Sequence, residues 1–181
     1  MAESHQHGDQ RTVRVLHDEA AIAHRIAAMA REIAATLSGE PTVVGLLKGG
    51  FVFTADLVRA LGREGLTPRV EFMQVASYGA AKESSGHVRL IGDVPNVSGQ
   101  DVLLLDDIQD TGRSLAYAKS LLEEAGARRV RTAVLADKPS RRKVDFAADF
   151  IGFVVDDVFL VGYGIDYAER YRHLPFIGTV D

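Results

Sequence analysis

Apolar side chains recur in the first quarter of the chain with the period of an α-helix. Ile22, Ile26, Met29, Ile33 and Leu37 follow one another at spacings of four, three, four and four. Such spacing places all five on one face of a helix. Asp18 can cap the start of this helix and Gly39 can stop it, so the pattern predicts a helix with one buried face.

Beyond this helix, short apolar runs alternate with further helical patterns. The apolar runs cover residues 42–47, 102–105 and 130–135, and the helical patterns cover residues 51–61 and 114–125. Buried strands that alternate with helices predict an α/β fold with a parallel sheet covered on both faces. In such sheets, ligands bind at the carboxyl ends of the strands.

The remaining segments differ from this alternation. Residues 70–76 and 87–91 have an extended pattern and flank residues 77–86, a small, polar, glycine-bounded segment that we expect to be mobile. Later, residues 149–161 hold two apolar strands, which predict a small lobe added to the sheet. The preceding basic run, 141–143, is interpreted as a solvated loop, because a nucleic-acid patch would carry more positive charge nearby.

Composition narrows the class of protein. The chain has 181 residues, 46% apolar, with a net charge of −4 and no cysteine. We expect a flexible tail over residues 1–12 and a single domain over 13–181, since a domain of this size buries about 70% of its unfolded surface. Absence of cysteine excludes disulfides and thiolate sites and suits a reducing compartment. We therefore expect a cytoplasmic protein.

Two kinds of partner are excluded by the same reasoning. No apolar run approaches the roughly 18 residues that span a bilayer, and the first ten residues lack the basic start and apolar core of a secretory signal. Mild acidity argues against a surface that binds duplex nucleic acid. The sequence therefore predicts no membrane partner and no nucleic-acid partner.

The segment of residues 102–114 holds the richest chemistry. Its polar part contains Asp106, Asp107, Asp110, Thr111, Gly112, Arg113 and Ser114. A buried strand delivers two carboxylates, and the loop after them leads into a helix N-terminus, where free N–H groups favour a phosphate. Carboxylates beside a phosphate are explained if they face sugar hydroxyls or Mg²⁺. These residues indicate a sugar phosphate; taken singly, each could be only a turn former or a helix cap.

Four apolar residues, two acids and then Asp-Thr-Gly-x-Ser resemble the phosphoribosyl pyrophosphate signature of type I phosphoribosyltransferases. Other segments resemble the hypoxanthine-guanine branch of this family: 47–50, 77–79, 136–139 and 161–167, followed by Tyr171-Arg172. The resemblance implies a twisted parallel sheet flanked by helices, with a small C-terminal hood. It also implies purine salvage: transfer of the 5-phosphoribosyl group from phosphoribosyl pyrophosphate to N9 of hypoxanthine and/or guanine, giving IMP or GMP and pyrophosphate.

The resemblance assigns roles to the residues of this signature. Asp110 assists proton movement at the purine imidazole nitrogens, and its carboxylate offsets positive charge on the ribose carbon. Asp106 and Asp107 hold the ribose hydroxyls, directly or through magnesium and water. The backbone of Asp110, Thr111, Gly112, Arg113 and Ser114 holds the 5′-phosphate.

The base-binding residues are assigned in the same way. Lys138 resembles the lysine that donates to the purine O6 and so selects keto purines, because adenine presents an amino group there. Phe159 resembles the aromatic residue that stacks on the base, and Leu160 the neighbour whose backbone reads the purine edge. Without the resemblance, Lys138 would be interpreted as a surface lysine and Phe159 as a core aromatic.

Pyrophosphate and magnesium complete the implied site. Lys48 and Gly49 resemble the pyrophosphate loop, in which the family tends to hold a non-proline cis peptide, and Arg172 resembles an arginine that faces pyrophosphate. Asp166 resembles a second acid of the magnesium site. The resemblance thus implies Mg²⁺ as cofactor, with phosphoribosyl pyrophosphate and a 6-oxopurine as substrates.

The resemblance also implies a lid and an oligomer, and it is broken at one position of the signature. Ser77 and Tyr78 match the start of a mobile lid, which would exclude water from the ribose. Gln109 departs from the family, which more usually has an aliphatic residue there. The family also implies a homodimer or homotetramer.

Three other functions are compatible with parts of the sequence: a regulatory protein, a receiver-like domain and a xanthine-guanine enzyme. A regulatory nucleotide-binding protein with the same fold tends to lose the aspartate before Thr-Gly, whereas Asp110 is present. A receiver-like phospho-acceptor domain would use Asp106 or Asp107 but does not explain Asp-Thr-Gly-Arg-Ser. The xanthine-guanine branch is disfavoured because the chain has no tryptophan to stack on the base. Acceptance of xanthine stays open.

Overall fold

The structure is a computed structural model that describes residues 12–77 and 88–180. Almost all of the predicted tail and of the segment 77–86 therefore lies outside the described residues. The helices and strands are β1 (Val13–His17), α1 (Glu19–Ala34), β2 (Thr42–Leu47), α2 (Phe51–Arg63), β3 (Arg69–Ser77), β4 (Val88–Ile91), β5 (Asp101–Gln109), α3 (Arg113–Glu124), β6 (Arg129–Asp137), the 3-10 helix η1 (Pro139–Arg141), β7 (Phe150–Val154), β8 (Leu160–Val161) and β9 (Ile177–Val180).

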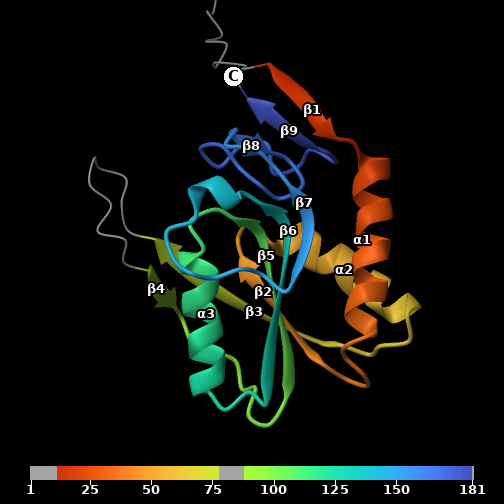
Figure 1. The fold of residues 1–181 in the computed structure, drawn as a ribbon, viewed down its shortest axis with the longest axis vertical. Helices are drawn as coiled ribbons and strands as arrows, with labels where there is room; N and C mark the ends of the chain where they lie inside the picture. Colours follow the sequence, from red (N-terminus) through yellow and green to blue (C-terminus); the bar gives the residue numbers. More distant parts are fainter. Residues whose placement is uncertain (1–11, 78–87, 181) are drawn as a thin grey trace, which may run out of the picture.

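Six strands form the main sheet in the order β4-β3-β2-β5-β6-β7 (Figure 1). The pairs from β3 to β7 are parallel, and β4 is antiparallel to β3 at the edge. The carboxyl ends of β2, β5 and β6 therefore meet at one end of the sheet. The predicted α/β fold, a parallel sheet flanked by helices, is confirmed.

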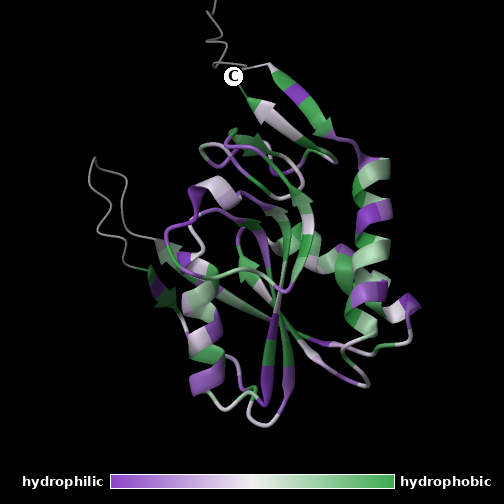
Figure 2. Cartoon of the chain, viewed as in Figure 1, coloured by the Kyte–Doolittle hydropathy of each residue, from purple (hydrophilic) through white to green (hydrophobic). Residues whose placement is uncertain are grey.

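Helices cover both faces of this sheet. Helices α1 and α2 lie on one side and α3 on the other (Figure 1). Successive side chains of a strand point to opposite faces. On β5, Leu103 and Leu105 join the core under α1 and α2, whereas Val102 and Leu104 join the core under α3. This two-sided burial explains the uninterrupted apolar runs in the middle of β2, β5 and β6, whose ends are more polar, and Figure 2 shows green and purple stretches on these strands accordingly.

The segment with helical apolar spacing in the first quarter of the chain is a helix, α1, as predicted. Ile22, Ile26, Met29 and Ile33 are buried on α1, and the Asp18 side chain caps its start by accepting the Ala21 N–H at 2.8 Å. The helix ends at Ala34, before Leu37, which was expected on the same face. Leu37 is buried nevertheless, because the chain after the helix turns back against the core.

Strand β5 is longer than the apolar run predicted. It continues through Asp106 and Asp107 to Gln109, because β6 pairs with it as far as Gln109 opposite Asp137. Asp106 and Asp107, which were expected just after the strand, therefore lie on the strand itself. Helix α3 begins at Arg113, one residue before the predicted start.

A second sheet forms the hood. Its order is β1-β9-β8, with antiparallel pairs, so it joins the beginning and the end of the described chain. The hood was expected to be C-terminal, and the structure corrects this by adding β1. Of the two apolar strands predicted within 149–161, β7 belongs to the main sheet and only β8 to the hood.

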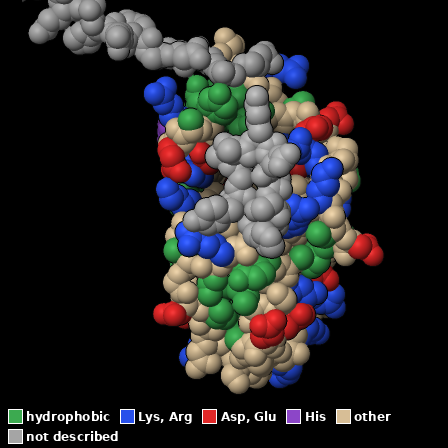
Figure 3. Space-filling view, turned by 90° about the vertical axis from the view of Figure 1, so that its left-hand side faces the viewer, with side chains coloured by type: hydrophobic (Ala, Val, Ile, Leu, Met, Phe, Trp, Pro, Cys, Tyr) green, Lys and Arg blue, Asp and Glu red, His purple; other side chains and the backbone are tan. Residues whose placement is uncertain are grey.

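Two further observations concern partners. Among the described residues, the structure has no helix long and apolar enough to cross a membrane. Figure 3 shows acidic side chains beside basic ones on the side of the molecule where β4 and α3 lie. This mixture is expected from a chain with 21 basic and 25 acidic residues.

Candidate active site

A polar cavity of about 410 Å³ lies at the carboxyl ends of β2 and β5. Most of the residues that the sequence singled out for phosphate, ribose and pyrophosphate line it. Its described lining is Leu46, Leu47, Lys48, Gly49, Gln74, Val75, Asp106, Asp107, Ile108, Gln109, Asp110, Thr111, Gly112, Ser114, Leu115, Asp166, Glu169 and Arg172. The fold thus brings together residues that lie more than a hundred positions apart in the chain.

A second cavity, of about 590 Å³, lies between α1 and α2. It is larger, but its lining is mainly apolar, with Ile22, Ile26 and Phe51 among its members. It contains neither the acid pair nor the phosphate loop. The smaller cavity is therefore the better candidate for a sugar phosphate.

The acid pair stands at the end of β5. The N–H of Asp107 donates to Asp106 Oδ1 at 2.9 Å, and the N–H of Ile108 donates to Asp107 Oδ1 at 2.8 Å. Burial, followed by the charge of Asp107, raises the pKa of Asp106 well above its usual range, and burial also raises the pKa of Asp107. Two adjacent, partly buried carboxylates favour ligands that bring donors or positive charge, such as a sugar diol or a divalent cation.

The loop from Asp110 to Ser114 has the geometry of an anion site. Gly112 adopts a φ of 82°, a conformation that favours glycine, and it precedes the first turn of α3, whose N–H groups have no partner within the helix. A side chain on Gly112 would press against Arg142 and Val144. Of the five residues assigned to the phosphate, Asp110, Thr111, Gly112 and Ser114 line the cavity, whereas Arg113 is not in its lining.

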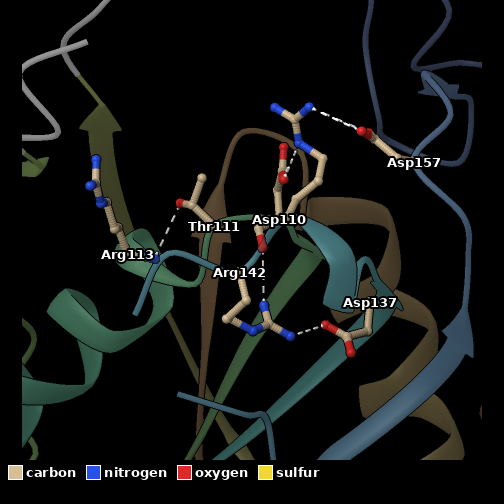
Figure 4. A network of polar contacts seen from close by, with 7 residues as sticks. Asp110, Thr111, Arg113, Asp137, Arg142 and Asp157 are labelled. Atoms are coloured by element: carbon tan, nitrogen blue, oxygen red, sulfur yellow. Dashed lines mark hydrogen bonds and ion pairs between the residues drawn. The ribbon is translucent and has the colours of Figure 1, made fainter. Parts of the chain in front are cut away.

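The predicted solvated basic run packs against this loop (Figure 4). Arg141 remains exposed, as expected for a solvated loop, whereas the Arg142 side chain is only 18% exposed, so the interpretation is wrong for Arg142. Arg141 Nε donates to Asp110 Oδ1 at 2.7 Å, and Arg141 Nη1 lies 3.4 Å from each carboxylate oxygen of Asp157. Arg142 donates to the Asp110 carbonyl at 3.1 Å and pairs with the buried Asp137. The run is ordered because it meets carboxylates from three different segments.

Gln109, the departure from the family pattern, braces the same loop. Its buried side chain donates to the Phe146 carbonyl at 3.0 Å and accepts the Ala148 N–H at 3.1 Å. The backbone adds a bond from the Lys143 N–H to the Thr111 carbonyl at 3.0 Å. Apart from the unusual residue type at position 109, no local pattern indicates these long-range contacts.

Lys138 lies close to the start of the phosphate loop. It directly follows β6, and its N–H donates to the Gln109 carbonyl at 3.0 Å. It is only 7% exposed, so the alternative of a surface lysine is wrong. Burial lowers the pKa of its ammonium, and the charges of Asp110 and Asp157 act in the opposite direction. Lys138 therefore sits within electrostatic reach of the acid assigned to proton transfer.

Phe159 and Leu160 belong to the hood side. Phe159 is 51% exposed, so the alternative of a core aromatic is wrong, and its ring meets Tyr167 edge-on at 5.2 Å between centroids. Leu160 is buried on β8 opposite Thr179. Neither of them, nor Lys138, is among the described residues that line the 410 Å³ cavity. The described lining of the cavity thus does not include the assigned base-binding residues.

On the opposite wall, four charged side chains pair with one another. Lys48 Nζ lies 3.1 Å from Glu169 Oε2, and Arg172 lies 2.9 Å from Asp166 and 3.5 Å from Glu169. Lys48, more than Arg172, holds the pKa of the Glu169 carboxyl below its usual range. Sequence reasoning missed Glu169, although its position three residues before the assigned Arg172 was a usable signal.

The pyrophosphate loop packs tightly against its neighbours. The Leu47–Lys48 peptide is cis, which confirms the expected non-proline cis bond in this loop. A side chain on Gly49 would overlap the Asp107 carboxylate, and one on Gly164 would overlap the Gly49 carbonyl. Only glycine fits these close approaches.

The lid and the metal were also expected here. Ser77 is the last residue of β3, opposite Val88, while Tyr78 lies outside the described residues. Among the described residues, no group of three or more histidine or acidic side chains could hold a metal alone. Asp106, Asp107 and Asp166 nevertheless line one cavity. This suits Mg²⁺, which usually takes one or two carboxylates together with substrate oxygens.

Comparison with known proteins decides the family. The family model described as "Phosphoribosyl transferase domain" matches residues 13–168. The chain belongs to the phosphoribosyltransferase family. A hypoxanthine-guanine phosphoribosyltransferase of Aquifex aeolicus is 45% identical over 172 residues, which cover 93% of this chain and 95% of that protein.

Other relatives agree with this membership. The hypoxanthine phosphoribosyltransferase of Escherichia coli is 43% identical over 93% of this chain and 96% of its own length. A bifunctional protein TilS/HprT of Listeria monocytogenes is also 43% identical, but the phosphoribosyltransferase chain described here spans only 26% of its length. A solved hypoxanthine-guanine phosphoribosyltransferase of Bacillus anthracis superposes with a TM-score of 0.86 at 37% identity, covering 94% of this chain and all of that one.

Proposed function

We propose that this phosphoribosyltransferase acts in purine salvage and transfers the 5-phosphoribosyl group from phosphoribosyl pyrophosphate to N9 of hypoxanthine and/or guanine. The products are IMP or GMP and pyrophosphate. The observation that carries the proposal is one cavity in which the acid pair and phosphate loop face Lys48 and Arg172. The relatives named for hypoxanthine and guanine indicate the bases.

The sugar phosphate binds along the end of β5. Free N–H groups at the start of α3, with the Thr111 and Ser114 hydroxyls, donate to the 5′-phosphate. Asp106 and Asp107 accept hydrogen bonds from the ribose hydroxyls, and these bonds offset the cost of placing two partly desolvated carboxylates side by side. These contacts fix C1′ of the ribose between the base and the leaving group.

In the reaction, the C1′–N9 bond forms and the C1′–O bond to pyrophosphate breaks. Asp110 accepts the imidazole proton of the base, and its negative charge stabilises the positive charge on C1′. In the free protein this carboxylate is bonded to Arg141, which also contacts Asp157. Arg141 therefore keeps a partner when Asp110 turns to the base.

The base lies between the phosphate loop and the hood. Lys138 donates to O6, Phe159 stacks on the purine ring, and the backbone at Leu160 reads the purine edge. The exposure of Phe159 supports this role, because a half-exposed aromatic ring can still stack on a ligand.

Pyrophosphate leaves along the opposite wall, bound by Lys48, the N–H of Gly49 and Arg172. Asp166, with Asp106 and Asp107 through water, would hold Mg²⁺, which supplies positive charge to the diphosphate oxygens. Ser77 and Tyr78 begin a lid that excludes water during transfer. The cytoplasmic location and the homodimer or homotetramer also belong to the proposal, as does a single domain over residues 13–181.

A regulatory protein of the same fold is not favoured. It would bind phosphoribosyl pyrophosphate or a nucleotide as a signal, without needing the acid at Asp110. Here Asp110 is retained and lines the cavity.

The test is product formation from phosphoribosyl pyrophosphate with hypoxanthine, guanine, xanthine and adenine in parallel, with magnesium and with excess EDTA. We expect nucleotide and pyrophosphate in equal amounts from hypoxanthine and/or guanine, little product from adenine, and none in EDTA. Preference for adenine would contradict the role of Lys138. Full turnover in EDTA would contradict the magnesium requirement. If phosphoribosyl pyrophosphate is not consumed with any base, the proposed function is wrong.

A further inference from the structure

Glu169 places a carboxylate over the pyrophosphate wall of the cavity. Its Oε2 lies 3.1 Å from Lys48 Nζ and 3.5 Å from the Arg172 guanidinium. Within the described residues, these two cations are the groups that its carboxylate contacts. They are also the two side chains that the proposed function gives to pyrophosphate.

The backbone holds Glu169 in this place even though its side chain is two-thirds exposed. Its φ is 61°, Ala168 before it has a φ of 51°, and its N–H donates to Asp166 Oδ2 at 2.8 Å. A bridge between Tyr167 and Arg170 closes the same turn. The ordered turn therefore places Glu169 next to Lys48 and Arg172, where its carboxylate makes both ion pairs.

The charges of this wall cancel in the free protein. Two cations, Lys48 and Arg172, face two carboxylates, Asp166 and Glu169. Under the proposed function, Mg²⁺ would offset the negative charge of Asp166. The proposed function provides no bound cation to offset the negative charge of Glu169. When a diphosphate arrives, the Glu169 carboxylate and the diphosphate oxygens need the same donors, and like charges at short range repel.

We propose that Glu169 takes the place of pyrophosphate oxygens in the free enzyme and competes with pyrophosphate for Lys48 and Arg172. Its negative charge thereby weakens the binding of both phosphoribosyl pyrophosphate and the pyrophosphate product. This inference rests on the proposed function. It makes Glu169 a residue that sets diphosphate affinity through the two cations, with the benefit that the product leaves more easily.

The test is Glu169→Gln, which keeps the shape of the side chain and removes its charge. We expect magnesium pyrophosphate, titrated by calorimetry, to bind about two- to fivefold tighter, the range given by exposed ion pairs. KM for phosphoribosyl pyrophosphate should fall by a similar factor. The difference from wild type should shrink in about 1 M salt, where charges are screened beyond about 3 Å.

The opposite sign distinguishes a structural role. If Glu169 only holds Lys48 and Arg172 in position, the variant will bind magnesium pyrophosphate more weakly, and equal affinity would likewise overturn the inference. Glu123→Gln is the matched control, because Glu123 is an exposed acid on α3 that pairs with Lys119 at 3.8 Å. It should change neither affinity nor KM.

Failure of the proposed function would look different. In that case the wild-type chain would form no nucleotide from phosphoribosyl pyrophosphate with any of the four bases. An active wild type with unchanged or weakened pyrophosphate binding in Glu169→Gln would contradict only the inference about Glu169. Glu169→Ala, with the same expected sign, guards against a new hydrogen bond made by the glutamine amide.

Discussion

The two walls of the cavity are built by different means. On the sugar-phosphate wall, the acid pair ends a buried strand, the phosphate loop opens a helix, and Gln109 and Arg142 brace the loop from behind. On the pyrophosphate wall, the Lys48 and Glu169 side chains are 57% and 66% exposed and mainly pair with other charged side chains. One wall depends on backbone and burial, and the other on ion pairs between charged side chains.

This difference suits the two ends of one substrate. The ribose carbon must be held in place while its bonds change, and preorganised groups in a buried setting do this well. The diphosphate must bind and then leave, and exposed charges can exchange one partner for another at little cost. Changes to the first wall should therefore affect chemistry and stability, whereas changes to the second should affect affinity and its salt dependence.

The largest effect is expected from Asp110→Asn. Loss of a positioned acid or base lowers kcat by roughly 10² to 10⁴. KM for phosphoribosyl pyrophosphate should change little, because the proposed contacts to the 5′-phosphate come from backbone N–H groups and not from the Asp110 carboxylate. Asp157→Asn serves as control, since it removes the other partner of Arg141 and leaves Asp110 in place. Steady-state kinetics decide the matter, and a near-normal kcat in Asp110→Asn would remove this residue from the mechanism.

Gly49→Ala tests the contact between the two walls. An added methyl group would overlap the Asp107 carboxylate, so the pyrophosphate loop would have to shift. Overpacking of this kind costs about 1–3 kcal/mol, which corresponds to a loss of about 5- to 150-fold in kcat/KM for phosphoribosyl pyrophosphate. Gly62→Ala on α2, where a methyl group meets nothing within 4 Å, should leave kcat/KM unchanged. Equal activity of the two variants would show that the walls are not in contact.

Lys138→Ala tests the base-binding end of the first wall. A hydrogen bond to a charged group contributes about 1.5–3 kcal/mol, so the preference for hypoxanthine over adenine should fall by about tenfold or more. The measurement is the ratio of kcat/KM for the two bases. If that ratio stays the same, Lys138 does not read O6.

Gln109→Leu tests the bracing of the phosphate loop. It restores the aliphatic character usual in the family but leaves the Phe146 carbonyl and the Ala148 N–H without their partner. An unsatisfied buried group costs about 1–3 kcal/mol, and each kcal/mol lowers Tm by about 2–4 °C in a domain of this size. Calorimetry should show a lower Tm, and an unchanged Tm would mean that the loop repacks without these bonds.

Asp106→Asn should have the smallest effect, and it concerns pH. The folded pKa of Asp106 is raised above the ordinary value near 3.8, so between these two values the folded state binds more protons than the unfolded state. Stability therefore falls as pH rises through this window, and the loss is complete above it. The neutral variant should melt higher than wild type at pH 8, with a smaller gain at pH 5. A lower Tm at pH 8 would contradict the raised pKa.

How far the sequence predicted this arrangement depends on how local each signal was. The parallel sheet, the acid pair and the phosphate loop were predictable, because the apolar runs, the helical spacing and the signature of residues 102–114 each occupy one contiguous stretch of sequence. The hood strand β1 was missed because its exposed residues carry no period and its partner β9 lies at the other end of the chain. The pairs Lys48–Glu169 and Arg141–Asp110, separated by 121 and 31 residues, are visible only after folding.

The most direct test of the difference between the walls compares the salt dependence of two ligands. Magnesium pyrophosphate and IMP both carry a formal charge of about −2, but the first binds the exposed charges and the second the phosphate loop. Calorimetric titrations from low to high salt should show a steep loss of affinity for magnesium pyrophosphate and a shallower loss for IMP. Equal slopes, or a steeper slope for IMP, would contradict the assignment of backbone binding to one wall and charge binding to the other.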